Sequence, residues 1–317
     1  MNQITTFEKF RLFSNLLLGN LKKDWKAFVR QDKPILNALQ LKSSYQFEIS
    51  SAHMRKLKEV CHVTGNTIPL LYPAVTLFYP VAKLLTSSHY PFPAIGGIHT
   101  ANKTILHRKL HENDQLRMSL EPRKEVVHAK KGSEVQLTSK LFETVNGADC
   151  VVWENSMTLL VQHKYHLTQK ENINTWCEPL PSDLKELFQD TWKLEPSVAR
   201  NYAGVSQDYN PIHLHDLGAK LFGYSNIIIH GMYMLTRASA ECQRILEEKH
   251  ALKYPLEVST KFQRPCTLPQ KVQFKIYSIR NDNHRLYFVV LSEASKVLVD
   301  GYVTAGAVAY DNTQSTS

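Results

Sequence analysis

The sequence predicts an α+β protein built from two similar units in tandem. In each half of the chain, a long apolar stretch of helical character precedes several short segments in which apolar and polar residues alternate. A helix that precedes the main run of strands must bury its apolar side against one face of their sheet, which gives an α+β layer rather than alternating βαβ units. The chain has 317 residues, about twice the commonest domain size, so two such units fit.

An internal repeat supports this organisation. Setting Arg264 over Arg108 aligns further strand residues and leaves a turn between the aligned strands in each half. The further pairs are Phe262 with Leu106, Val272 with Leu116, and Phe274 with Met118. Self-similarity of this kind indicates a duplicated structural unit.

The first predicted part, residues 1–45, is an N-terminal helical extension. Between residues 5 and 30, aromatic and leucine side chains recur at three- and four-residue steps, and a basic face lies opposite them. Such a helix can dock on its own domain or lie on an anionic membrane surface, and docking is the commoner arrangement. We therefore expect docking, with membrane contact by residues 5–30 as the alternative.

The second part, residues 46–168, is predicted to start with a strand-like segment that ends near Val63. A helix over 71–85 follows, with too little chain before it for an overhanging active-site loop. Strands are then predicted at 104–108, 115–120, 134–138 and 151–161. A polar connector separates this unit from the next.

The third part, residues 185–312, repeats the plan. Its helix is predicted over 231–246. Its strands are predicted at 257–264, 272–279, 286–291 and 297–308.

Composition narrows the class of protein. Apolar residues make up 43% and charged residues 21%, which is typical of globular chains. The run Leu16–Leu18 is too short for a signal sequence or a membrane span. A net charge of +9 suits an anionic partner, but without a block of Lys and Arg among aromatic residues we expect no nucleic-acid binding.

The cysteines indicate a reducing compartment. They are odd in number and scattered, without the close pairs of a metal site or disulfide framework: Cys61, Cys150, Cys177, Cys242 and Cys266. We expect reduced, buried thiols in a cytoplasmic protein.

The residue types suited to proton transfer gather in one segment. Asp208, Asn210 and His213 fall within six residues, around a proline that favours a turn. Taken alone, this segment could be a turn in which Asp and Asn bond their own backbone. However, Gly231 then opens an apolar helix, whose first N–H groups are available to a developing negative oxygen. Acid, base and oxyanion donors thus occur within one short span.

The run from Tyr202 to His213, followed by Gly223-Tyr224 and Ile229-His230-Gly231-Met232, resembles the signature of the MaoC-like (R)-specific enoyl-CoA hydratases and dehydratases. Phe262-Gln263-Arg264-Pro265 resembles the family's aromatic-x-Arg-Pro strand. The resemblance implies a tandem double hot-dog fold, in which each unit is an antiparallel sheet wrapped round a central helix. The first unit would be a degenerate copy that accommodates the acyl chain.

The resemblance also implies a reaction and its residues. Asp208 and His213 would be the catalytic pair that binds the attacking water, Asn210 would help to orient that water, and the backbone N–H of Gly231 would polarise the thioester carbonyl. The reaction would hydrate a trans-2-enoyl thioester to an (R)-3-hydroxyacyl thioester. It would need no metal or redox cofactor, since coenzyme A or acyl-carrier phosphopantetheine belongs to the substrate. The chain would act as a monomer of two pseudo-subunits or as a homodimer.

One residue departs from the family pattern. Gln207 stands where the family usually has glycine before the catalytic Asp, and a side chain there could reshape the pocket mouth. We expect His215 to be solvated, His230 to fix the helix start, and His107 and His111 to be surface or strand residues.

Three alternatives to a coenzyme A hydratase stay open at this point. They are a non-catalytic acyl-thioester-binding or scaffold protein closed by Gln207, an acyl-carrier-protein dehydratase, and a hot-dog thioesterase, against which the intact Asp-x-Asn-Pro-x-His argues.

Overall fold

The structure is a computed structural model that describes residues 26, 29–30, 35–65, 67–94, 96–129, 131–163, 181–279, 282 and 284–306. Most of the helix predicted over 5–30, most of the connector, and Cys177 lie outside these residues. The boundaries 1–45, 46–168 and 185–312 stay predictions.

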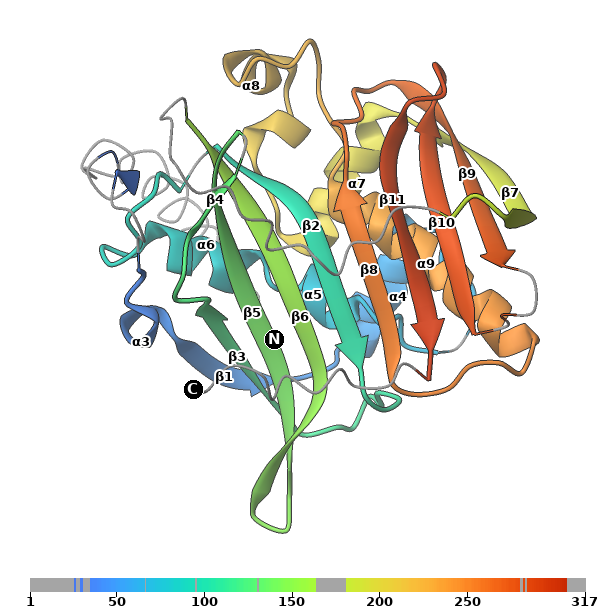
Figure 1. The fold of residues 1–317 in the computed structure, drawn as a ribbon, viewed down its shortest axis with the longest axis horizontal. Coiled ribbons are helices and arrows are strands. Elements are labelled where there is room, and N and C mark those ends of the chain that lie inside the picture. The colour runs from blue at the N-terminus through green and yellow to red at the C-terminus, as the bar shows by residue number, and fades with distance from the viewer. Residues whose placement is uncertain are drawn as a thin grey trace.

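Within the described residues, one antiparallel sheet of 11 strands runs through both halves of the chain (Figure 1). The order is β1-β3-β5-β6-β2-β8-β11-β10-β9-β7, and β4 pairs with β5. The first half contributes β1 (Ser43–Phe47), β2 (Gly97–Leu106), β3 (Leu116–Pro122), β4 (Val127–Ala129), β5 (Gly132–Val145) and β6 (Ala148–Gln162). The second half contributes β7 (Leu184–Leu194), β8 (Leu256–Phe262), β9 (Gln270–Ile279), β10 (Arg285–Ser292) and β11 (Val297–Ala305).

The helices lie mainly behind this sheet in Figure 1. The first half has α3 (Ala38–Leu41), α4 (Ser51–Val60), α5 (Tyr72–Val75) and α6 (Phe78–Thr86). The second half has α7 (Pro196–Ser206), a 3-10 turn η1 (Pro211–His213), α8 (Asp216–Leu221) and α9 (Gly231–Glu248). No helix among the described residues is both long and apolar enough to cross a bilayer.

The two half-sheets join through the antiparallel pair β2 and β8. Lys103 lies opposite Ser259 in this pair. These two residues are 156 positions apart, which is the spacing that sets Arg264 over Arg108. Lys103 and Ser259 are therefore equivalent positions of the internal repeat that lie opposite each other. A pseudo-two-fold axis that relates the two halves passes between them. The register confirms the internal repeat, and both halves show the expected sheet around a helix.

A second spacing relates the segments that precede the central helices. The N-caps of α4 and α7 are Ser50 and Glu195, and both helices end near a left-handed residue, His62 (φ 52°) and Gln207 (φ 63°). Both pairs are 145 residues apart. The second half therefore has 11 more residues between Gln207 and the residue of β8 at the pseudo-two-fold axis than the first half has between His62 and the residue of β2 at that axis. This longer stretch contains η1 and α8.

The prediction of a strand that ends near Val63 is wrong. The strand ends at Phe47, and residues 51–60 form α4. The side chain of Ser50 caps this helix by accepting from the His53 N–H at 3.3 Å. Met54 and Leu57 are buried at helical spacing. The chain between α4 and α5 is nevertheless shorter than the chain between α7 and α9, which contains η1 and α8.

The helix predicted over 71–85 is instead two short helices. The break falls at Thr76 and Leu77, between α5 and α6. Pro80 has no N–H to donate to the carbonyl of Thr76, so one continuous helix is disfavoured there. As the third residue of α6, Pro80 sits in a first turn, where proline is tolerated.

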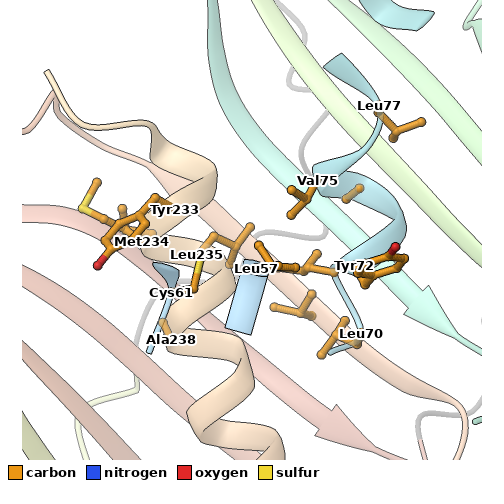
Figure 2. Close-up of a cluster of buried hydrophobic side chains, with 14 of the residues drawn as sticks. Leu57, Cys61, Leu70, Tyr72, Val75, Leu77, Tyr233, Met234, Leu235 and Ala238 are labelled. Atoms are coloured by element: carbon orange, nitrogen blue, oxygen red, sulfur yellow. The ribbon is translucent and has the colours of Figure 1, made fainter. Parts of the chain in front are cut away.

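The helices of the two halves share one apolar core (Figure 2). Leu57 and Cys61 from the first half are fully buried beside α9, as is Leu235 of that helix. The close-up shows a cluster that also includes Leu70, Tyr72, Val75, Leu77, Tyr233, Met234 and Ala238. Among the described residues, the buried side chains of the two halves therefore form one core.

Gly301 tests how tightly the strands of the second half pack. A Cβ on this residue would lie 2.2 Å from the Ser259 carbonyl oxygen and 2.8 Å from Phe288 Cζ. We predict that Gly301→Ala lowers the free energy of unfolding by about 1–3 kcal/mol, measured by urea denaturation. Gly97→Ala is the control, since a Cβ there meets nothing within 4 Å, and we expect a change within about 0.5 kcal/mol. Equal effects of the two changes would contradict this account of the packing.

Candidate active site

The turn after α7 carries the predicted acid and base. α7 ends at Ser206, and Gln207 adopts the left-handed conformation with φ 63° and ψ 12°. Glycine adopts this conformation at the least cost, which explains why a glycine is usual there in the resembling family. The Gln207 side chain turns back onto its own helix, where Nε2 donates to the Gly204 carbonyl at 3.0 Å. Its amide therefore serves as a helix cap.

Short-range hydrogen bonds fix this turn. Ser206 Oγ donates to the Tyr202 carbonyl at 2.9 Å and accepts from the Asp208 N–H at 3.2 Å. Asp208 Oδ1 accepts from the Asn210 N–H at 3.2 Å, and Asn210 Oδ1 accepts from the Ile212 N–H at 3.4 Å. The local Asp and Asn turn, which was the alternative interpretation of this segment, therefore exists alongside the convergence of acid and base.

His213 lies beside Asp208 at the end of η1. Its Nδ1 is 2.8 Å from the carbonyl oxygen of Ile228, which can only accept. Nδ1 therefore carries the proton, and Nε2 has a free lone pair. Nε2 is 4.0 Å from Asp208 Oδ2. One water with hydrogen bonds of about 2.8 Å to both atoms can span this gap.

His230 is a third member of the site, and the sequence interpretation missed it. It occupies the N-cap position of α9, but its side chain makes no capping bond, contrary to its expected role in fixing the helix start. Its Nε2 instead donates to the Asp208 carbonyl at 3.1 Å and lies 3.9 Å from Asp208 Oδ2. Its ring stacks on His213, with centroids 3.7 Å apart. Its place beside Gly231 in the motif was the available signal.

Burial dominates the electrostatics of these three groups. It raises the pKa of Asp208 above its ordinary value, against the opposing effects of His213 and the Asn210 N–H. Burial also lowers the pKa of His213, which Asp208 partly offsets. The pKa of His230 is held well below its ordinary value by burial and then by His213. All three groups are thus biased towards their neutral forms.

The start of α9 completes the site. The N–H of Gly231 is at the helix N-terminus, where backbone donors have no intrahelical acceptor. A Cβ on Gly231 would lie 2.8 Å from Cδ1 of Phe262, so this close approach requires glycine. The ring of His99, from the first half, packs on Phe262 with centroids 4.7 Å apart. Burial lowers the pKa of His99 to about 4, so this wall of the site is uncharged.

Asp208, His213 and His230 lie close enough to be considered as metal ligands. Their candidate atoms all lie within 4.8 Å of one another. However, Nε2 of His230 carries the proton that it donates to the Asp208 carbonyl, so its lone pair is not available there. The arrangement fits proton transfer better than metal binding, and the absence of a metal stays a prediction.

The remaining histidines singled out in the sequence lie away from this cluster. His215 is exposed at the N-cap of α8. His107 follows β2 and bonds Glu154 at 2.9 Å, and His111 is exposed.

Comparison with known proteins places the chain in a family. Residues 182–309 match the family described as MaoC like domain. The chain is 30% identical over 206 residues to 3-hydroxyacyl-thioester dehydratase X of Mycobacterium tuberculosis. The aligned residues make up 65% of this chain and 68% of the relative. The chain belongs to the MaoC-like dehydratase family. The matched range contains Asp208, Asn210, His213 and Gly231.

Solved structures share the fold of this MaoC-like protein. The crystal structure of HtdX from Mycobacterium tuberculosis is 24% identical, with a TM-score of 0.63, covering 82% of this chain and 99% of that one. A MaoC-like dehydratase from Phytophthora capsici is 16% identical, with a TM-score of 0.68, covering 86% and 96%. The fold is the tandem double hot-dog that the resemblance implied.

The left-handed conformation of Gln207 can be tested by substitution. We predict that Gln207→Gly changes the free energy of unfolding by less than about 1 kcal/mol, because relief of the left-handed backbone offsets the lost hydrogen bond. Gln207→Val should destabilise by about 1–3 kcal/mol, since a β-branched residue is disfavoured at positive φ. Gln207→Asn, which tolerates this conformation, is the control. Urea denaturation of all three checks this, and a harmless Val would contradict it.

The raised pKa of Asp208 predicts a pH-dependent cost to stability. The folded state holds this proton more tightly than the unfolded state, whose value is near 3.8. Stability is therefore lost as pH rises from 3.8 through the folded pKa. We predict that Asp208→Asn is as stable as wild type at pH 3.5 and more stable at pH 7.5, by thermal unfolding. If the stability difference between Asp208→Asn and wild type does not grow with pH, the pKa of Asp208 is not raised in the folded state.

Proposed function

We propose that this MaoC-like protein catalyses the reversible hydration of a trans-2-enoyl thioester to an (R)-3-hydroxyacyl thioester. The observation that carries the proposal is the pair of Asp208 Oδ2 and His213 Nε2, 4.0 Å apart, in the segment that precedes the N-terminus of α9. The relative from Mycobacterium tuberculosis, named a 3-hydroxyacyl-thioester dehydratase, supports the same chemistry.

The tautomer and the pKa shifts support separate roles for the two groups. Burial favours neutral Asp208 and neutral His213. In hydration, Nε2 of His213 takes a proton from water as the water oxygen bonds to C3, and Asp208 gives its proton to C2. The resulting imidazolium and carboxylate attract each other. Dehydration is the reverse: the carboxylate removes the C2 proton and the imidazolium protonates the leaving hydroxyl.

Gly231 and Asn210 are placed to stabilise the thioester oxygen and to orient the water, respectively. Attack at C3 moves negative charge onto the thioester oxygen, and the N–H of Gly231 at the helix N-terminus can stabilise that charge. Loss of one such donor typically costs roughly 3 kcal/mol. Asn210 uses Oδ1 to cap η1, which leaves its Nδ2 as a donor to the water.

The substrate carries its own activating group. Addition of water changes the net oxidation state of neither substrate nor enzyme, so no redox cofactor is needed. We propose that no metal is needed either, because the N–H of Gly231 would polarise the carbonyl. The thiol carrier would be coenzyme A, with acyl-carrier phosphopantetheine as the alternative, and a positive net charge of +9 suits the phosphates of either. The first half would accommodate the acyl chain.

We also propose a cellular compartment and an oligomeric state for the protein. The described cysteines are free thiols, of which Cys61, Cys242 and Cys266 are buried, whereas Cys150 is exposed, contrary to the expectation of burial. Free thiols suit a reducing compartment, and we propose the cytoplasm. The covalent pairing of two units would let one chain act as its own dimer, alone or within a homodimer.

Loss of the enoyl absorbance of crotonyl-CoA and longer trans-2-enoyl-CoAs tests the proposal. We predict that Asp208→Asn and His213→Ala each lower kcat by about 10²–10⁴-fold, because each removes one of two proton-transfer groups. His215→Ala is the matched control: it removes an exposed histidine two residues from His213, and we expect an unchanged kcat.

Each other outcome has a defined meaning. No turnover by wild type at any chain length or on either carrier would overturn the enzyme assignment and favour an acyl-thioester-binding protein. Activity retained in both Asp208→Asn and His213→Ala would overturn the site. Release of free thiol would indicate a thioesterase, and chiral analysis of the product decides the (R) assignment.

A further inference from the structure

The catalytic turn is held by a side chain from the other half of the molecule. His53 lies on α4, which packs against α7. Its Nε2 is 2.8 Å from the carbonyl oxygen of Val205, although 152 residues separate the two in sequence. Val205 is three residues before Asp208, at the end of α7. We infer that His53 is a positioning residue for the reaction: it fixes the end of α7 and thereby the place of Asp208.

The contact has a defined direction. A carbonyl oxygen can only accept, so Nε2 of His53 carries the proton and Nδ1 has the lone pair. The hydroxyl of Tyr72 lies 3.3 Å from this Nδ1 and accepts from the Ser50 N–H at 3.1 Å. Burial raises the pKa of Tyr72 to about 12, so its hydroxyl keeps its hydrogen. That hydrogen has two acceptors within reach, Nδ1 of His53 at 3.3 Å and the Ser50 carbonyl at 3.4 Å. The imidazole is therefore in contact with a polar group at each of its two nitrogens.

The group that His53 binds needs a partner. The last carbonyls of a helix have no intrahelical donor. At the end of α7, Gly204 receives the side chain of Gln207 and Tyr202 receives that of Ser206. These donors come from the helix itself, whereas Val205 is served from the first half. His53 thus ties the helix end to an independent element.

The position of Asp208 depends on this helix end. Gln207, between Val205 and Asp208, is held at a positive φ that costs energy for any residue with a side chain. The Asp208 N–H bonds Ser206 Oγ at 3.2 Å. A shift of about 1 Å in a reacting group can cost on the order of 100-fold in rate. A small release of the helix end therefore suffices to impair proton transfer without unfolding the protein.

The loss of this bond should affect stability less than rate. His53 is half-buried, so its removal leaves space that solvent can enter. A water there can donate to the Val205 carbonyl in place of the imidazole. Water cannot replace the rigid link to α4.

This inference rests on the proposed hydratase activity and is tested by kinetics. We predict that His53→Ala lowers kcat on an enoyl-CoA by about tenfold or more, with KM changed by less than about threefold. His53→Gln, whose amide donor can reach Val205, should recover most of kcat. A purely structural role would lower the folded fraction, and kcat per folded molecule would then equal that of wild type.

His107→Ala is the matched control. It removes a histidine of the same half whose hydrogen bond, 2.9 Å to Glu154, is of similar length but does not touch α7. We expect its kcat to equal that of wild type. An unchanged kcat in His53→Ala, or an equal loss in His107→Ala, would overturn the inference.

Hydrogen exchange gives a readout that needs no activity. In His53→Ala, we expect faster amide exchange over residues 205–214 than in wild type, with no such change in His107→Ala. If wild type turns over no enoyl thioester, the proposed function fails while this exchange difference still shows whether His53 holds the turn. Unchanged exchange in His53→Ala would overturn the inference.

Discussion

The antiparallel pairing of β2 with β8 is the constraint on which the rest of the molecule depends. It makes one sheet from two half-sheets and places each half's elements about a pseudo-two-fold axis between Lys103 and Ser259. That symmetry brings the counterpart helices α4 and α7 into contact. It also puts His99 of β2 against Phe262 of β8, beside the start of α9. The site in the second half therefore has walls and supports supplied by the first.

The two halves keep the same turn but differ in what the turn carries. Both α4 and α7 end near a left-handed residue, His62 or Gln207. Only after Gln207 does the described chain continue into an Asp-x-Asn-Pro-x-His segment. The electrostatic setting of that segment is costly, because burial disfavours the charged forms of Asp208, His213 and His230 alike. Such groups are typical of sites built for chemistry, and the remaining packing has to supply the stability that they remove.

Much of the fold followed from local pattern, and the exceptions have physical causes. The helix that begins at Gly231 was predicted at its start because its apolar spacing is long and regular. The helix α4 was missed because ten residues give a weak periodic signal. The closeness of Asp208 and His213 was predictable because a proline turn brings near neighbours in sequence together. The parts played by His230 and His53 depend on side-chain contacts across 22 and 152 residues, which no local pattern specifies.

The shared sheet and core have a consequence for how the protein behaves when dilute. An enzyme whose site is completed by a second subunit loses that support as its concentration falls below the dissociation constant of the dimer. Here α4 and the turn that carries Asp208 belong to one polypeptide, so they meet at an effective concentration set by the chain itself. Because the two units are encoded in one chain, a substitution can change one unit and leave the other unchanged. In a homodimer, every substitution would appear in both units.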